Sequence, residues 1–253
     1  MTTDTGNPTI LLIPGHWLGA WAWDDVVEHL TSLGHRAIPL TLPGLDTTDA
    51  DRVTRTLDEQ AAAIAQVAAS SSGPVVIVAH SGANAPVTLV LDRHPELVSR
   101  VIWVDSGPAT SGVALAPDFP EDMDGLSLPP FEVLGEQASL EGLSADALER
   151  FRKRAVSEPG TVLRQTVLLT NDARFDIPTT FVCCSIPSAQ VRELVRAGHP
   201  MFAEVANFTS VDYVDLPTGH WPMWSRPSEL ARILAGDCTF NFQRCNSDPG
   251  GTR

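Results

Sequence analysis

Lysine is almost absent from this chain of 253 residues, in which Lys153 is the only one. It lies within Arg-Lys-Arg at 152–154, a pattern typical of a solvated helix face, so Schiff-base chemistry is not expected. Positive charge is scarce in general, because 17 Lys and Arg face 31 Asp and Glu, for a net charge of −14. This balance argues against nucleic acid and anionic membranes as partners.

Long apolar runs are also missing. No stretch reaches the roughly 18 residues that a membrane-spanning helix needs. Residues 1–8 are short and polar, so we expect no secretory signal and predict a cytoplasmic location.

Cysteines are few, and none has the spacing of a metal site, so no metal is expected. Cys183 and Cys184 are adjacent and would point to opposite faces of a strand, which suits neither a metal nor a mutual disulfide. Cys238 and Cys245 could pair across a short loop, or all four thiols could be reduced.

Strand and helix patterns alternate along the chain, which predicts one α/β domain with a mostly parallel sheet flanked by helices. The six predicted strands cover 9–14, 37–42, 75–79, 101–104, 179–184 and 213–216. The predicted helices cover 21–33, 56–69, 82–93, 189–197, 200–206 and 227–235. Thr56 and Glu59 have the spacing of a capping box, which favours a helix start at that point.

The alternation stops after Asp105 and resumes at Thr179. The intervening stretch is too long for a plain crossover, and it contains helix patterns at 144–155 and 161–169. We therefore predict a core of residues 1–107 and 177–236, a helical lid over 108–176, and a polar tail over 237–253 without an assigned role.

The most informative motif is Ala79-His80-Ser81-Gly82-Ala83, which follows a fully apolar strand and precedes a helix pattern. Small residues on both sides allow a sharp turn that exposes the serine hydroxyl, so Ser81 is a candidate nucleophile. We interpret His80 as packing or hydrogen-bonding support.

A serine nucleophile needs a base with a pKa near 7, which indicates histidine. Of the seven histidines, His220 is the best placed, because it follows the last predicted strand in the segment Gly219-His220-Trp221. A loop at the carboxyl end of that strand returns to the sheet edge where Ser81 would lie.

The segment Ala79-His80-Ser81-Gly82-Ala83 resembles the nucleophile elbow of the α/β-hydrolase superfamily, with alanine in place of both customary glycines. The segment from Pro14 to Trp21 resembles the oxyanion loop of the methylesterase and hydroxynitrile-lyase branch, with Pro14 in place of its histidine. The resemblance implies an oxyanion hole formed by the backbone N–H groups of His16 and Gly82.

Superfamily members usually carry the triad acid after the penultimate strand, but residues 184–190 contain no carboxylate. Asp105, at the end of an earlier strand, is therefore the predicted acid, and a Ser–His dyad or an acid from the lid are the alternatives. Trp17, Trp221 and Met223 are predicted to contact substrate.

The implied function is that of a serine hydrolase that cleaves a small carboxylic ester or lactone through an acyl-enzyme. Such a mechanism needs no metal and no organic cofactor, so none is expected. One alternative is a lyase or cyclase that uses the same Ser/His pair for proton transfer. A non-catalytic ligand receptor is disfavoured by the complete set of Ser, His and Asp. The expected partner is a small-molecule substrate, and a homo-oligomer is left open.

Overall fold

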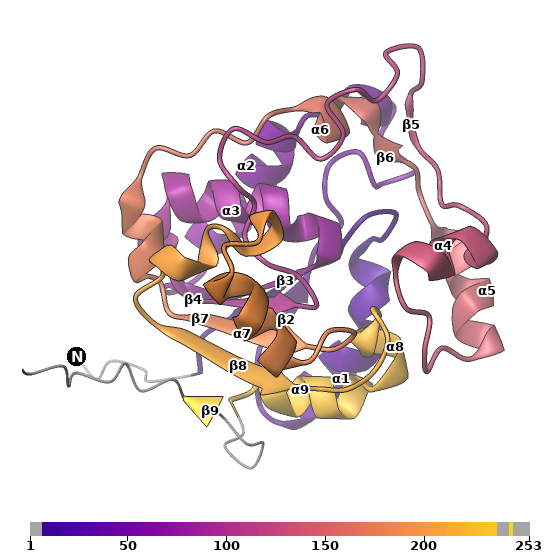
Figure 1. Ribbon diagram of the computed structural model, residues 1–253. Helices are drawn as coiled ribbons and strands as arrows, with labels where there is room; N and C mark the ends of the chain where they lie inside the picture. Colours follow the sequence, from indigo (N-terminus) through magenta and orange to yellow (C-terminus); the bar gives the residue numbers. More distant parts are fainter. Residues whose placement is uncertain (1–6, 237–242, 245–253) are drawn as a thin grey trace, which may run out of the picture.

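The central feature of the fold is a mostly parallel β-sheet, seen in a computed structural model that describes residues 7–236 and 243–244 (Figure 1). Its order is β2-β1-β3-β4-β7-β8-β9. The strands are β1 (Ile10–Ile13), β2 (Ala37–Pro39), β3 (Val75–His80), β4 (Val98–Val104), β7 (Thr179–Cys183), β8 (Val211–Asp215) and β9 (Gln243–Arg244). The six predicted strands are confirmed and run parallel, and the two-residue β9 adds an antiparallel edge.

Helices cover both faces of the sheet. They are α1 (Asp24–Ser32), α2 (Leu57–Ala69), α3 (Asn84–Arg93), α7 (Ser188–Arg196), α8 (Pro222–Ser225) and α9 (Pro227–Leu234). Short 3₁₀ turns are η1 (Ala20–Trp23), η2 (Arg52–Thr54), η3 (Ser81–Ala83), η4 (Pro95–Leu97), η5 (Asp172–Asp176), η6 (Pro200–Phe202) and η7 (Val205–Asn207). The capping box at Thr56 and Glu59 is confirmed, whereas the helix predicted over 200–206 is split into η6 and η7.

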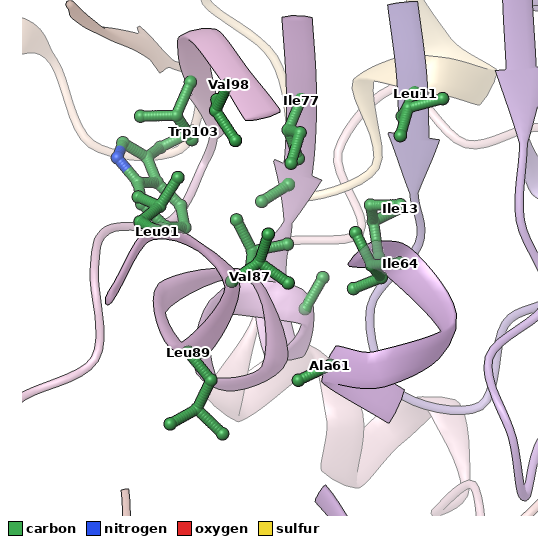
Figure 2. Packing of buried hydrophobic residues seen from close by; sticks show 14 of the residues in the cluster. Leu11, Ile13, Ala61, Ile64, Ile77, Val87, Leu89, Leu91, Val98 and Trp103 are labelled. Atoms are coloured by element: carbon green, nitrogen blue, oxygen red, sulfur yellow. The ribbon is translucent and has the colours of Figure 1, made fainter. Parts of the chain in front are cut away.

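Two hydrophobic cores lie on opposite faces of the sheet, because side chains alternate along each strand. On one face, Leu11 and Ile77 pack against Ile64 of α2 and Val87 of α3 (Figure 2). The other core joins alternate strand residues such as Leu12 with side chains of α1 and α9. The inner strands β3 and β4 are therefore packed on both faces, and their carboxyl ends lie at the same edge of the sheet.

The inserted segment, residues 108–176, interrupts the sheet between β4 and β7. It contains β5 (Gly125–Leu126), α4 (Phe131–Gln137), α5 (Ala145–Arg154), β6 (Glu158–Pro159) and α6 (Gly160–Arg164). β5 and β6 pair antiparallel and form a small ribbon.

The helix predicted over 161–169 is wrong beyond Arg164. There the backbone leaves the helix and forms hydrogen bonds with an earlier part of the inserted segment. Val167 N donates to Val113 O, and Gly112 N donates to Val167 O.

Within the described ranges, no helix is both long and apolar enough to cross a bilayer. Cys238 and Cys245 lie outside the described residues, as does most of the predicted tail.

Candidate active site

Ser81 occupies a strained turn at the carboxyl end of β3. Its φ of 51° lies in the left-handed region, which non-glycine residues seldom adopt. The loop after β1 approaches so closely that a Cβ on Gly15 would lie 2.7 Å from the Ser81 Cβ. The turn and the tight loop packing fix the direction of the hydroxyl, as the elbow motif predicts.

His220 lies between Ser81 and Asp105, although 139 and 115 residues separate it from them. Its Nε2 is 2.8 Å from the Ser81 Oγ, and its Nδ1 is 2.6 Å from Oδ2 of Asp105. With Nδ1–H donating to the carboxylate, Nε2 is free to accept the serine proton. The structure thus brings together the three residues that the sequence analysis placed on separate segments.

Asp105 is held by four hydrogen bonds at the end of β4. Oδ1 accepts from the backbone N–H groups of Cys184 and Ser185, and Oδ2 accepts from the Ser185 hydroxyl and from His220. Burial opposes ionisation of this carboxyl, but the hydrogen bonds from His220 and Ser185 outweigh it and hold its pKa below the usual value. An ionised Asp105 fixes the tautomer of His220.

His80 packs beside His220, the candidate base, with 4.9 Å between the ring centroids. Burial, reinforced by the neighbouring His220, lowers its pKa to about 3, so the ring is neutral at ordinary pH. The carbonyl oxygen of His220 lies 2.8 Å from Nε2 of His80 and can only accept, so His80 donates this hydrogen bond. This confirms the interpretation of His80 as a supporting residue.

The two backbone N–H groups predicted for the oxyanion hole lie on adjoining segments. The imidazole of His16 packs against the Cα of Gly82, where a Cβ would lie only 2.2 Å from Nε2. The backbone N–H of His16 has no acceptor within the described part of the chain. Trp17 follows with a φ of 67°, so the loop is strained immediately after His16.

A cavity of about 660 Å³ opens onto these groups. Trp17 and Trp221, which were predicted to contact substrate, line this cavity, and the Trp221 ring meets the His220 ring edge-on with 4.9 Å between the ring centroids. Met223 was predicted wrongly, because it is fully buried in the core and does not line the cavity. It lies on α8, which turns this side chain inward.

Cys183 also lines the cavity, and Cys184 is buried beside it. Burial, with the negative charges of Asp215 and Asp105, raises the pKa of the Cys183 thiol to about 12. Burial raises the pKa of Cys184 as well. Neither thiol is a competing nucleophile at neutral pH.

Three residues at the site were missed in the sequence. They are Ser185, Glu158 and Gln60. The Ser185 hydroxyl donates to Asp105. Glu158 contacts the His16 ring through Oε2 and accepts a hydrogen bond from Gln60 at Oε1. Ser185 could have been found, because it follows the strand from which the usual acid is missing. Glu158 lies in the two-residue strand β6 with no sequence motif around it, so no local signal marks it. Among the described residues, no three His, Cys, Asp or Glu side chains cluster so that they could hold a metal ion.

Comparisons with known proteins identify the family and the fold of this chain. The sequence profile of the "Alpha/beta hydrolase family" matches residues 10–233. Methylesterase 2 of Arabidopsis thaliana is 28% identical over 156 residues, which are 60% of this chain and 58% of that protein. Esterase PIR7B of Oryza sativa subsp. japonica is 25% identical over 88% of this chain and 93% of its own length.

A solved structure, an extracellular alpha/beta-hydrolase from a Paenibacillus species, superposes with a TM-score of 0.72. Its sequence is 18% identical, and the match covers 91% of this chain and 98% of that one. This likeness shows the fold. The match to Methylesterase 2 spans less than two thirds of that relative.

Proposed function

Because the chain belongs to the α/β-hydrolase family, we propose that it is a serine hydrolase that cleaves small carboxylic esters or lactones. The observation that carries the proposal is the continuous line of hydrogen bonds from Ser81 through His220 to Asp105. Similarity to a methylesterase and to an esterase supports ester hydrolysis as the reaction.

In this mechanism, Ser81 attacks the carbonyl carbon of the ester while His220 takes its proton at Nε2. The imidazolium that forms is stabilised by the ionised Asp105. The N–H groups of His16 and Gly82 hold the oxyanion of the tetrahedral intermediate. His220 then protonates the leaving alcohol, and a water molecule, activated by the same histidine, releases the acid from Ser81.

The cavity favours a neutral substrate with apolar groups. Its lining includes Leu115, Leu134, Phe181 and Phe202. Among the described residues, no lysine or arginine lines it, so nothing there balances an anionic substituent. We therefore propose a neutral ester, such as a methyl or short alkyl ester of an apolar acid.

We further propose that the inserted segment acts as the lid of this cavity. Leu134 and Ser139 from this segment contribute to the lining. The segment also holds the loop of the base, because Gly219 N donates to Glu141 O and His220 N donates to Ser139 O. A cytoplasmic location and a homo-oligomer stay predictions.

The proposal is tested by steady-state turnover of p-nitrophenyl butyrate and of a panel of methyl esters and lactones. The wild-type protein should hydrolyse members of the panel, and Ser81→Ala should abolish turnover. A fluorophosphonate should label Ser81 in the wild type. If it labels Ser81 but no ester or lactone is cleaved, the hydrolase assignment is refuted and proton-transfer chemistry by the same pair is favoured.

A further inference from the structure

The inserted segment is attached, at and beside the ribbon of β5 and β6, to the loop after β1, which carries one of the two proposed oxyanion donors, the N–H of His16. The Trp17 indole N–H donates to Leu126 O at 2.9 Å, and Val156 N donates to Trp17 O at 3.0 Å. Nδ1 of His16 lies 2.9 Å from Oε2 of Glu158. Three hydrogen bonds from one part of the inserted segment therefore reach two adjacent residues of the oxyanion loop.

Glu158 is a buried carboxylate, with 2% of its surface exposed. Oε1 accepts from Nε2 of Gln60, and the same amide nitrogen donates to Pro43 O. Within the described ranges, the ring of His16 is the hydrogen-bond partner of Oε2. A buried polar group is costly unless it is hydrogen-bonded, so Glu158 and His16 depend on each other, and Gln60 fixes the direction of the Glu158 side chain.

The His16 ring in turn packs closely against Gly82. A Cβ built on Gly82 would lie 2.2, 2.3 and 2.5 Å from three ring atoms, Nε2, Cδ2 and Cε1. Such nearly equal distances mean that the Cα of Gly82 faces the flat side of the imidazole. The ring belongs to the residue that supplies one proposed oxyanion N–H and lies against the residue that supplies the other. Its position therefore sets the spacing of the two donors.

We propose that Glu158 is a positioning residue for the oxyanion hole, acting through the ring of His16. This inference rests on the proposed function, since it concerns the hole that the reaction would use. It gives the inserted segment a role beyond covering the cavity, because one of its carboxylates holds the donors where the oxyanion forms. The strain at Trp17, which the same ribbon holds, is consistent with a loop that is kept in place from outside.

The test is a double-mutant cycle with Glu158→Leu, His16→Ala and the double variant, assayed for kcat and KM with the best ester of the panel. His16→Ala retains the backbone N–H and removes only the ring. Each single variant should lower kcat by about 10²-fold, the scale of a displacement of about 1 Å, and leave KM within about threefold. The double variant should lose no more than either single one, because the two side chains act as a unit.

Glu158→Gln supplies the conservative variant. Its amide retains the length and a hydrogen bond to either tautomer of His16, so it should recover most of the kcat that Glu158→Leu loses. Glu121→Leu, an exposed glutamate of the same inserted segment, is the matched control and should have wild-type kcat. A trifluoromethyl ketone inhibitor, whose adduct with serine carries an oxyanion, should bind Glu158→Leu about 10²-fold more weakly.

The outcomes separate the two proposals. A wild-type protein that cleaves no ester and resists the fluorophosphonate would overturn the proposed function and this inference together. An active wild type with unchanged kcat and inhibitor affinity in Glu158→Leu would overturn the positioning role alone. Should Glu158→Leu fail to fold, the comparison of His16→Ala with wild type and with Glu158→Gln still decides, since full kcat in His16→Ala would refute it.

Discussion

Replacement of Asp105 by asparagine is the most specific perturbation of the proposed mechanism. Two backbone N–H groups, from Cys184 and Ser185, point at Oδ1 and cannot rotate away. The amide oxygen of the asparagine must therefore face them. Its NH₂ group then takes the place of Oδ2 and faces Nδ1 of His220.

This arrangement reverses the hydrogen bond to the base. Nδ1 of His220 must now accept, so the proton of the neutral ring moves to Nε2, the atom that lies 2.8 Å from Ser81 Oγ. A nitrogen that carries a proton cannot take the serine proton. We expect kcat to fall by about 10⁴-fold, as in comparable triads, which corresponds to about 5 kcal/mol of transition-state stabilisation.

The assay is p-nitrophenyl butyrate turnover, with a thermal denaturation curve to confirm folding. Asp215→Asn is the matched control, because Asp215 also ends a strand and accepts from the backbone N–H and hydroxyl of one serine, Ser188. It should retain kcat within about threefold. A folded Asp105→Asn protein with kcat within about tenfold of wild type would refute the role assigned to Asp105.

Three further variants test the surroundings of the site. His80→Gln keeps a neutral hydrogen-bond donor that cannot titrate. The pKa of His80 is about 3 in the folded protein and 6.5 ordinarily, so the unfolded chain binds a proton between these values that the folded protein does not. As the pH falls from 6.5 to 3, the wild type should therefore lose about 1.4 kcal/mol of unfolding free energy per pH unit relative to this variant, measured by urea denaturation. Gly15→Ala places a Cβ 2.7 Å from the Cβ of Ser81, so it should lower the free energy of unfolding by about 1–3 kcal/mol and remove most of the activity. Gly73→Ala is the control, because open space surrounds Gly73, and it should change neither thermal denaturation nor turnover. Trp17→Ala removes an apolar wall of the cavity and should raise KM about tenfold for apolar esters; an unchanged KM across an ester series would assign the ring to packing.

The sheet was predictable because buried parallel strands are continuous apolar runs, and those between residues 9 and 216 are short and well separated. Ser81 and His220 were predictable for a related reason, since parallel strands bring their carboxyl ends to one edge. The usual superfamily pattern would not have identified Asp105, because it places the acid after the penultimate strand, where residues 184–190 contain no carboxylate. The structure explains the departure, because Ser185, which occupies the place of the missing acid, donates to Asp105.

The inserted segment was the least predictable part of the chain. The helix predicted past Arg164 does not form, because hydrogen bonds to residues 112–113 replace the helical ones. Glu158 contacts His16 across 142 residues, and no periodicity encodes a pairing at that range. Met223 was misplaced because proximity to His220 in sequence does not determine which way a short helix turns its side chains.

The most direct test of the central claim is to trap the acyl-enzyme. Wild-type protein mixed with p-nitrophenyl acetate and quenched in acid within milliseconds should carry one acetyl group on the peptide that contains Ser81, detected by mass spectrometry. The acetyl group should disappear at the rate of turnover and be absent in Ser81→Ala. Ester turnover without an acyl group on Ser81, or turnover at the wild-type rate in Ser81→Ala, would contradict the account.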